Sequence, residues 1–394
     1  MRILYHTWDA LGGFETVDYF KQAGYEYKCI YNTAPSIEAK NYDPEYEEKL
    51  NAEFQSTHYD CLFSWNYFPI DARVCHDHGI PYISWTYDCP VYCGDISETL
   101  SFDTNFAFFF DKNQAREMSR ICSSTVYYLP LPADISRVDR FKLTREEKKK
   151  YSTDISFVGQ LYPSATVYIK ESLSEYEKGY WDAMIDAQMK VYGQYFIPDL
   201  FTDEYITRLN TQLYGISNTH RLNMEKTMFS IPRNITSRER LLLLALLSQT
   251  HKVTLYCREN HAALKKVHFA GTVNNLTEAP KVFLASKINL NITLRSITSG
   301  IPLRVFDVMS CAGTLLSNYQ PEFPEYFTQW KDIVWYESII DAKEKADYLL
   351  KHEDECRRIG LNGFENVKNN FSFHVLFGKI FDAVFHESRD CQIF

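Results

Sequence analysis

The sequence has 394 residues, more than one hydrophobic core usually supports, so we expect two domains. Apolar residues make up 45% of the chain and charged residues 24%, which excludes a disordered chain and fits a globular one. The formal net charge of -9 argues against nucleic acid as the main partner, because phosphate backbones bind basic surfaces.

No segment has the pattern of a membrane anchor or a secretion signal. The N-terminal stretch, Met1-Arg-Ile-Leu-Tyr5, is too short and polar for a signal peptide. The longest apolar run, Leu241–Leu247, is far shorter than the roughly 20 residues that span a bilayer. We therefore expect a soluble, cytoplasmic protein without a transmembrane segment.

The ten cysteines stand mostly alone in apolar, strand-like segments. This placement favours buried thiols in a reducing cytosol over disulfides. Cys89 and Cys93 form a C-x₃-C pair, but no second Cys/His pair at metal-ligand spacing accompanies it. No metal site is expected.

Short β-rich runs alternate with helix-like stretches over about the first 130 residues. The expected strands are Arg2–Tyr5, Tyr25–Tyr31, Tyr59–Trp65, Pro81–Thr86, Phe106–Phe110 and Val126–Leu129. The expected helices follow the Gly12-Gly13 turn to about Ala23, and then cover Pro44–Gln55, Ile70–Asp77 and about Asn113–Arg120. This alternation predicts βαβ units and a parallel sheet.

The alternation stops after Leu129-Pro-Leu-Pro132 and resumes in a second domain. The predicted domains are residues 1–135 and 154–370, joined by a charged linker at 136–153. Polar helical sequence at about 165–228 predicts an insertion in the second domain. A C-terminal helix within 371–394 is expected to pack back towards the first domain.

The second domain is predicted to contain a further set of alternating elements. Its expected strands are Asp154–Val158, Lys252–Tyr256, Val267–Ala270, Ile288–Asn291, Thr314–Ser317 and Ile333–Trp335. Its expected helices are Ser237–Ser248, Pro280–Ser286, Pro302–Cys311, Ile339–His352 and Glu355–Asn370, before a last helix at Phe373–Phe385. Ligands of open parallel sheets bind outside the carboxyl ends of strands, so the loops after these strands are the candidate sites.

The first candidate site is the loop within Tyr5–Phe14, which joins a strand to a helix. Gly12 and Gly13 let the backbone approach a ligand, and a helix N-terminus favours polar or anionic groups. The loop lacks the G-x-G-x-x-G pattern of dinucleotide sites, and a tight turn without a ligand is the alternative. His6 and Asp9 are candidate substrate contacts, or else polar residues satisfied within the fold.

The second candidate site is the segment Ile80–Pro90. Asp88 follows a strand end there, among aromatic residues that include Trp85. A desolvated carboxylate in such a place can act as general base towards a hydroxyl. An aspartate that caps or braces the loop is the alternative.

The third candidate site lies between Lys287 and Phe327. Lys287 precedes a strand, and the next helix holds Arg304 and Asp307 in its first turns. A cation near a helix N-terminus suits a diphosphate, and an aspartate can accept both hydroxyls of a ribose. The alternative is a surface ion pair between Arg304 and Asp307, which are three residues apart on one helix face.

This third segment, with Pro302-Leu-Arg-Val-Phe-Asp-Val-Met and Pro321-Glu-Phe-Pro-Glu-Tyr, resembles the spore-maturation-type (CgeB-like) branch of GT-B glycosyltransferases. Other matching segments are Trp85–Pro90, Phe110–Lys112, Tyr128–Pro132, Ile155–Gly159, Ile235–Arg240 and Tyr348–His374. The resemblance implies an α/β, GT-B fold, in which two Rossmann-like domains face each other across a cleft. The function of the N-terminal domain of this branch is uncharacterised.

The resemblance implies a sugar donor held mainly by the second domain and an acceptor held mainly by the first. It assigns close approach to the donor to Gly159, diphosphate contacts to Lys287 and Arg304, and ribose contacts to Asp307. The donor-side candidates are Gly159, Gln160, Lys287, Asn291, Arg304 and Asp307, and the acceptor-side candidates are His6, Asp9, Gly12, Gly13 and Trp85.

Two positions depart from the larger retaining GT-B families. Asp307 aligns with the second glutamate of their E-x₇-E pattern, but Ser299 stands at the first. Gln160 opens the segment where those families often carry a basic pair. Inversion and retention at the anomeric carbon therefore both stay open, and Asp88 is the candidate base for an inverting reaction.

The resulting hypothesis is metal-independent transfer of a sugar from a nucleotide-diphosphate sugar to a hydroxyl of a protein, glycan or small molecule. A UDP-sugar is the expected co-substrate, without a further cofactor, and the setting is bacterial glycosylation with a possible homodimer. The alternatives are a nucleotide-sugar epimerase, a non-catalytic nucleotide-sugar or carbohydrate-binding protein, and a PLP-dependent phosphorylase.

Overall fold

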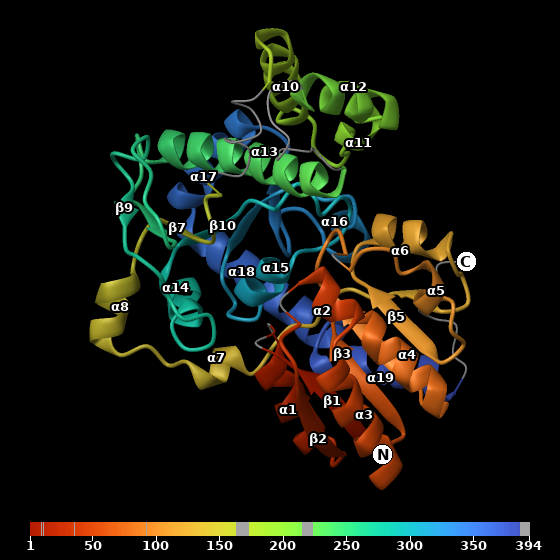
Figure 1. The fold of residues 1–394 in the computed structure, drawn as a ribbon. Helices are drawn as coiled ribbons and strands as arrows, with labels where there is room; N and C mark the ends of the chain where they lie inside the picture. The colour runs from red at the N-terminus through yellow and green to blue at the C-terminus, as the bar shows by residue number, and fades with distance from the viewer. Residues whose placement is uncertain are drawn as a thin grey trace. The chain divides into compact units, whose positions relative to one another are not determined.

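The computed structural model describes residues 1–8, 10, 12–34, 36–91, 93–162, 173–214 and 224–386. The chain forms two compact units, each with strands and helices in alternation (Figure 1). Unit 1 comprises Met1–Asp134 and Asn369–Phe394, and unit 2 comprises Ile135–Lys368.

Unit 1 is built on a six-stranded parallel sheet with the order β2-β1-β3-β4-β5-β6. Strands β3 and β4 are buried at every position, as expected for parallel strands covered on both faces. The strands are β1 (Arg2–Thr7), β2 (Glu26–Tyr31), β3 (Cys61–Trp65), β4 (Tyr82–Thr86), β5 (Asn105–Phe109) and β6 (Val126–Tyr128).

Seven helices accompany this sheet in the described part of unit 1. They are α1 (Gly13–Gln22), α2 (Ile37–Asn41), α3 (Pro44–Ser56), α4 (Pro69–His78), α5 (Ser97–Leu100), α6 (Lys112–Ser119) and α19 (Phe373–Phe385). The C-terminal helix α19 packs on α1, where Phe377 stacks on Tyr19 with ring centroids 4.7 Å apart. Its aromatic stripe, which recurs every four residues, places this distant segment in the core of unit 1.

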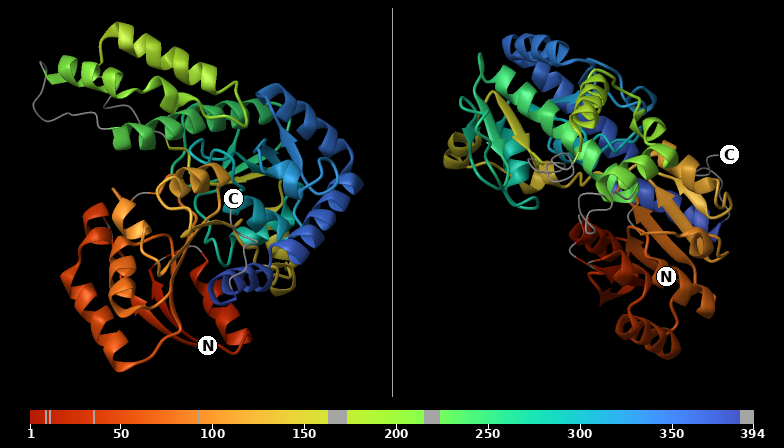
Figure 2. Two further views of the ribbon diagram at one scale, coloured as in Figure 1. Left: turned by 90° about the vertical axis from the view of Figure 1, so that its right-hand side faces the viewer. Right: turned by 45° about the horizontal axis from the view of Figure 1, so that its top comes forward.

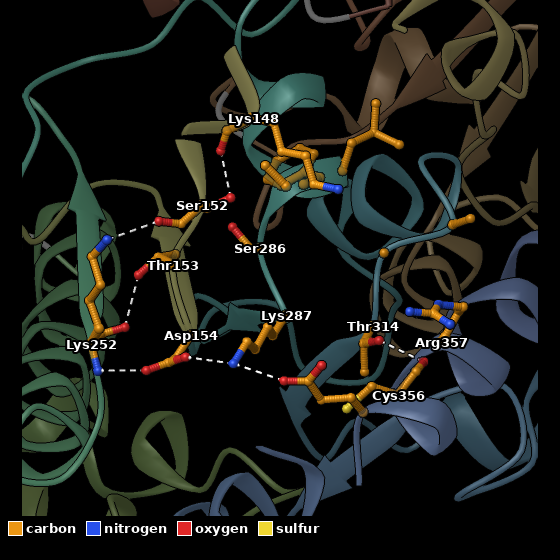
Figure 3. Close-up of a pocket in the computed structure, with 16 residues that line it drawn as sticks. Lys148, Ser152, Thr153, Asp154, Lys252, Ser286, Lys287, Thr314, Cys356 and Arg357 are labelled. Carbon is orange, nitrogen blue, oxygen red and sulfur yellow. Dashed lines mark hydrogen bonds and ion pairs between the residues drawn. The ribbon is translucent and has the colours of Figure 1, made fainter. Parts of the chain in front are cut away.

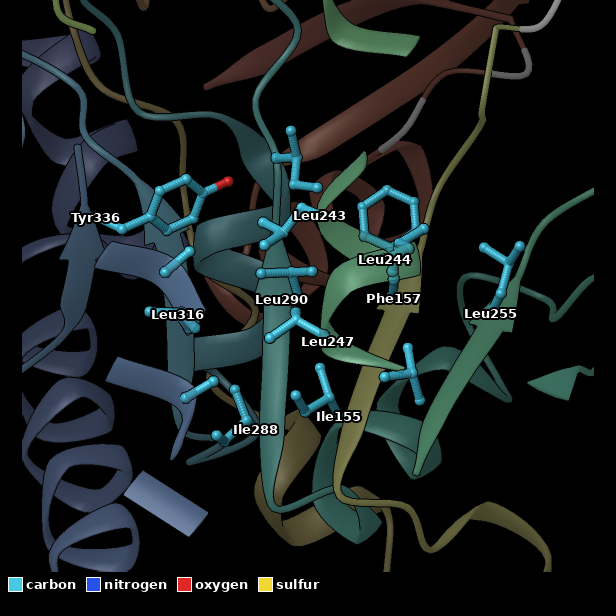
Figure 4. Packing of buried hydrophobic residues seen from close by; sticks show 14 of the residues in the cluster. Ile155, Phe157, Leu243, Leu244, Leu247, Leu255, Ile288, Leu290, Leu316 and Tyr336 are labelled. Atoms are coloured by element: carbon cyan, nitrogen blue, oxygen red, sulfur yellow. The ribbon is translucent and has the colours of Figure 1, made fainter. Parts of the chain in front are cut away.

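Unit 2 has its own six-stranded parallel sheet, with the order β12-β11-β10-β7-β8-β9. Leucines of helix α13 cover one face of this sheet, where Leu243, Leu244 and Leu247 meet apolar residues of β7 and β10 (Figure 4). The strands are β7 (Ile155–Val158), β8 (Val253–Tyr256), β9 (His268–Phe269), β10 (Ile288–Asn291), β11 (Leu315–Asn318) and β12 (Val334–Tyr336). The predicted pair of parallel-sheet, Rossmann-like α/β units is confirmed.

The predicted linker at 136–153 contains two helices of unit 2. Helix α8 begins at a capping box in which Thr144 and Glu147 exchange side-chain to backbone hydrogen bonds. The helices of unit 2 are α7 (Arg137–Arg140), α8 (Arg145–Tyr151), α10 (Glu175–Gln188), α11 (Ile197–Leu200), α12 (Asp203–Tyr214), α13 (Met224–Leu247), α14 (Ala279–Ala285), α15 (Leu303–Met309), α16 (Phe323–Tyr326), α17 (Ile339–Lys351) and α18 (Glu353–Asn370).

The described part of the predicted insertion is helical and has a small core of its own. Trp181 of α10, Phe201 at the end of α11 and Leu209 of α12 pack with Ile231 and Ile235 of α13. Helices α10 and α12 lie along α13 (Figure 2). Residues 163–172 and 215–223 of the predicted insertion lie outside the described residues. Among the helices that the structure describes, none is long and apolar enough to cross a membrane.

Replacing Gly360 by alanine is expected to destabilise unit 2 by about 1–3 kcal/mol, because overpacking forces a backbone shift. An added Cβ would collide with the carbonyl oxygen of Ala312, which helix α18 approaches at this point. Gly179→Ala is the matched control, since nothing lies within 4 Å of its Cβ position in α10. Urea unfolding should lower the midpoint for the first variant and leave or raise it for the second. Equal midpoints would contradict this packing.

Candidate functional site

The strand order of unit 2 reverses between β7 and β10, which lie side by side at the centre of the sheet. Open α/β sheets bind ligands outside the carboxyl ends of the strands at such a point. Two loops follow these ends, one beginning at Gly159 and the other at Ile292. They define the candidate ligand edge of unit 2.

Arg240 ties these two loops together from helix α13. Its guanidinium donates to the carbonyl oxygen of Ile292, at 3.2 Å from Nε, and to the carbonyl oxygen of Gln160. The side chain also stacks over the Phe157 and Tyr162 rings, at 5.2 and 5.1 Å from their centroids. Because Arg240 is buried and fully engaged with the protein, it positions the ligand edge and leaves ligand contacts to other residues.

Gly159 and Gln160 remain candidates at this edge. The Gly159 amide donates to the carbonyl oxygen of Tyr256 at 3.1 Å, which closes the end of β7 against β8. A Cβ on Gly159 would lie 3.1 Å from the ring of Phe157, so a larger residue would push the loop outward. The Gln160 side chain is exposed.

Asn291, predicted as a donor contact, is only 5% exposed and turns into the sheet. Its amide donates to Thr293 Oγ1 at 3.0 Å and to Ser317 Oγ at 2.9 Å. The Thr293 amide in turn donates to Asn318 Oδ1 at 2.7 Å. The prediction of a direct contact does not fit this placement, because the amide of Asn291 braces the loop instead.

The structure brings Arg304 and Asp307 together on helix α15. Arg304 Nη1 lies 3.0 Å from Asp307 Oδ2, and the other carboxylate oxygen pairs with Arg137 Nη1 at 2.6 Å. Burial lowers the pKa of the Arg304 guanidinium, although the neighbouring Asp307 charge opposes this shift. Arg137 and Arg304 thus both contact the Asp307 carboxylate. Asp307 has further lone pairs for ribose hydroxyls, since a carboxylate can accept about four hydrogen bonds.

Lys287, in contrast, lies at the opposite end of the sheet. It immediately precedes β10, and its ammonium pairs with Asp154 Oδ1 at 3.2 Å and Glu353 Oε1 at 2.9 Å (Figure 3). Hydrogen bonds to these two carboxylates raise the pKa of Lys287. The predicted pairing of Lys287 with Arg304 on one diphosphate is therefore not supported by this geometry.

Ser299 stands where the retaining families carry a glutamate, and it meets a glutamate from another loop. Its hydroxyl donates to Glu322 Oε1 at 2.8 Å, and the Glu322 amide donates to the Ser299 carbonyl oxygen at 3.2 Å. Both side chains are buried. A carboxylate is therefore present beside this position, although sequence spacing places it 23 residues later.

His6 in unit 1 is fully buried, so the prediction of a substrate contact is corrected. Its Nδ1 lies 2.6 Å from Asp71 Oδ2, and its Nε2 lies 3.0 Å from the carbonyl oxygen of Asn32. Tyr46 donates to the other oxygen of Asp71 at 2.9 Å. Burial lowers the pKa of His6, but the charge of Asp71 and the hydrogen bonds to Asp71 and to the Asn32 carbonyl oxygen together raise it above its ordinary value. The group is a satisfied polar cluster inside unit 1.

Trp85 is also a core residue, which corrects its assignment to the acceptor side. Its ring is buried and stacks on Trp65 with centroids 5.0 Å apart. Gly12 has φ +86°, and a Cβ there would lie 3.1 Å from the Trp65 ring, so both strain and space require glycine. Gly13 begins α1 beside it. Asp9 lies outside the described residues.

Asp88 is half-buried at the carboxyl end of β4 and is held by Asn66, which follows β3. Asn66 Nδ2 donates to Asp88 Oδ2 at 2.9 Å, and Asn66 Oδ1 accepts from the Asp88 amide at 3.2 Å. Asn66 has φ +64°, a strained value for a non-glycine residue. The strained asparagine, which follows β3 beside the β1/β3 switch point of unit 1, fixes the direction of the Asp88 carboxylate.

Two half-buried aromatic residues accompany this carboxylate. Trp8 follows β1 and its indole donates to the carbonyl oxygen of Trp65 at 3.1 Å. Its ring stacks on Tyr87 with an interplanar angle of 26° and centroids 6.3 Å apart. Such faces suit the C–H groups of a sugar ring. The edge of unit 1 thus combines a carboxylate with an aromatic surface.

Sequence reasoning missed Arg137, Arg240, Asn66 and Trp8. The available signal for Arg240 was a charged residue at the start of the Leu241–Leu247 run, since such a residue in an apolar helix needs a buried partner. Arg137 lay in a segment predicted as a linker, and no local pattern marks it. Trp8 lies in the first candidate loop, Tyr5–Phe14, but the sequence does not reveal which way its ring points.

Metal ligands and disulfides are absent from the described ranges. No group of three or more His, Cys, Asp or Glu side chains there is arranged to hold a metal ion. The nine described cysteines are free thiols. Cys391 lies beyond residue 386, the last that the structure describes.

Residues 237–380 match a protein family described as glycosyl transferase-like. No curated protein is significantly similar in sequence to the chain. Among solved structures, a glycosyltransferase from Rickettsia africae is similar with a TM-score of 0.57 at 9% identity, covering 98% of this chain and 99% of that one.

Two synthases are similar over comparable lengths. Sucrose-phosphate synthase from Thermosynechococcus elongatus has a TM-score of 0.55 at 10% identity, covering 98% of this chain and all of that chain. The UDP-forming trehalose-phosphate synthase from Burkholderia xenovorans has a TM-score of 0.51 at 11% identity, covering 99% of each chain. The fold of the chain is therefore GT-B, and this fold together with the glycosyl transferase-like region at 237–380 supports a glycosyltransferase.

Proposed function

We propose that the protein transfers a sugar from a UDP-sugar to an acceptor hydroxyl, with donor recognition in unit 2 and acceptor recognition in unit 1. The observation that carries the proposal is the ligand edge of unit 2. Its loop after β10, which begins at Ile292, lies within the glycosyl transferase-like region at 237–380. The UDP-forming synthase of similar fold favours UDP as the nucleotide of the donor. The sequence resemblance favours the spore-maturation-type branch.

In unit 2, the donor diphosphate is assigned to Arg304 and Arg137, and the ribose to Asp307. Arg304 and Arg137 both contact Asp307, and a guanidinium donates strong, charge-assisted hydrogen bonds to phosphate oxygens. Gly159 leaves space for close approach beside the exposed Gln160. These guanidiniums would stabilise the departing UDP in place of a metal ion, so metal-independent transfer is part of the proposal.

In unit 1, the acceptor is assigned to the edge formed by Trp8, Tyr87 and Asp88. The aromatic faces would hold a carbohydrate or another ring, and the carboxylate would take the proton of the attacking hydroxyl. This arrangement favours inversion at the anomeric carbon, because the base then lies on the acceptor side. The free thiols favour a reducing, cytoplasmic setting.

The test combines binding and turnover with Asp88→Asn. UDP and at least one UDP-sugar should raise the melting temperature of both wild type and variant. With that donor and a panel of glycan, peptide and small-molecule acceptors, wild type should release UDP and label the acceptor. Asp88→Asn should reduce kcat about 10²–10⁴-fold while UDP affinity stays unchanged.

Asp95→Asn is the matched control, because Asp95 is exposed and its carboxylate accepts hydrogen bonds from the amide and hydroxyl of Ser97, at the start of α5. It should keep wild-type turnover. Binding of the UDP-sugar without release of UDP in the presence of any acceptor would contradict transfer. Full turnover by Asp88→Asn would remove Asp88 from the reaction and leave donor binding intact.

A further inference from the structure

Unit 2 contains a cavity of about 530 Å³ at the amino ends of its strands (Figure 3). Asp154, Lys252, Lys287 and Thr314 line it, and each immediately precedes one of the strands β7, β8, β10 and β11. The ligand edge at Gly159 lies at the opposite ends of the same sheet. A four-residue strand spans about 13 Å, so the two places are separate.

The charged groups that line this cavity are unbalanced. Four are cationic and two are acidic, in a chain whose net charge is negative. The two carboxylates, Asp154 and Glu353, both pair with Lys287. The Lys252 ammonium donates to the carbonyl oxygen of Ser152 at 3.1 Å and has no carboxylate partner in the part of the chain described. Arg357 Nη1 lies 3.8 Å from Asp354 Oδ1 in an exposed pair just outside the lining. The lining itself holds more cationic than acidic groups, which suits an anionic ligand.

The remaining wall of the cavity is apolar and narrow. Phe283, Ala285 and Ala312 line it, next to Gly313. A Cβ on Gly313 would lie 2.8 Å from Asn289 Nδ2 and 3.2 Å from the carbonyl oxygen of Phe283, so a side chain does not fit here. A volume in the range of small-molecule sites leaves space for a carbon skeleton beside a charged group.

We propose that this cavity binds a small phosphomonoester, with Lys252 and Arg357 contacting the phosphate. A phosphomonoester is largely dianionic at neutral pH, which matches the excess of cations. Lys287 stays with its two carboxylates and fixes the floor of the site. The apolar wall contacts the sugar or nucleoside portion. This accessory site is independent of the proposed transfer function.

Isothermal titration of the full chain with glucose 6-phosphate, AMP and inorganic phosphate tests the proposal and separates a sugar phosphate from a nucleotide. At least one ester should bind more tightly than inorganic phosphate, and more weakly at high salt or at pH 5.5, where it loses charge. The double variant Lys252→Ala/Arg357→Gln should weaken binding at least tenfold. The control Lys331→Ala, an exposed lysine outside the cavity, should bind as wild type.

Saturating UDP distinguishes this site from the donor edge, and it should leave the affinity for the ester unchanged. The proposal is overturned if no ester binds, if the double variant binds normally, or if UDP competes. Both substituted side chains are on the surface, and an unchanged unfolding midpoint of the double variant shows that a loss of binding is local.

Discussion

Replacing Arg295 by methionine is expected to destabilise unit 2 by about 3–5 kcal/mol, the cost of leaving a buried charge without its partner. Arg295 Nη2 lies 2.7 Å from Glu239 Oε2, and the side chains are 7% and 0% exposed. The other Glu239 oxygen accepts from Tyr192 at 2.9 Å. Burial raises the pKa of that tyrosine, and the Glu239 charge adds to the shift. Guanidinium-chloride unfolding, followed by tryptophan fluorescence, measures the loss.

A second substitution separates charge burial from packing. The double variant Arg295→Met/Glu239→Leu should regain much of the lost stability, because apolar replacement of a buried ion pair is often nearly neutral. Arg238→Met is the matched control, because Arg238 lies next to Glu239 on helix α13. It breaks more exposed pairs with Asp182 and Asp186 and should cost less than about 1 kcal/mol. Equal losses for Arg295→Met and Arg238→Met would contradict the argument.

This ion pair also explains how the insertion is coupled to the ligand edge. Arg295 follows β10, and Glu239 lies on α13. Val191 follows helix α10 of the insertion, and its carbonyl oxygen accepts a hydrogen bond from Arg295 Nη1 at 3.3 Å. A loss of Arg295 should therefore loosen the loop after β10, so activity should fall at temperatures below the unfolding transition.

Most of the sheet architecture was predictable because it follows from local pattern. The expected strand Ile288–Asn291 has the bounds of β10, and Phe373–Phe385 those of α19. Buried parallel strands are continuous apolar runs, and such runs are visible without tertiary information. The short helices α2, α5 and α16 were missed, because four or five residues carry too little periodicity to reveal a helix.

Side-chain roles were less predictable, because they depend on which end of a strand a residue occupies and on distant partners. Lys287 and Arg304 lie in one segment, yet Lys287 precedes β10 and Arg304 follows it. His6 follows the strand pattern of β1, and only the fold reveals that Asp71, 65 residues away, pairs with it. Asp307 was predicted with Arg304 as partner, but Arg137 lies 170 residues earlier.

The largest effect on use of the donor is expected at Arg304. Arg304→Ala should reduce kcat/KM for the UDP-sugar about 10²–10³-fold, as for loss of one preorganised charge-stabilising group. Its guanidinium lies on α15 and is assigned to the diphosphate. Within the described part of the chain it pairs with Asp307 and lies over the Phe283 ring. Steady-state kinetics with the donor identified by the UDP-sugar panel measures the change. Arg358→Ala, on the exposed face of α18, should stay within about twofold of wild type.

Comparison of UDP with uridine assigns the effect to the phosphates. Wild type should bind UDP far more tightly than uridine, and Arg304→Ala should remove most of that preference, since it acts on the diphosphate. Asp307→Asn should instead weaken both ligands by a similar factor, because both contain the ribose. If Arg304→Ala retains the preference for UDP, the diphosphate lies elsewhere on unit 2. If Asp307→Asn weakens only UDP, its role is to hold Arg137 and Arg304 in place, and the ribose assignment is wrong.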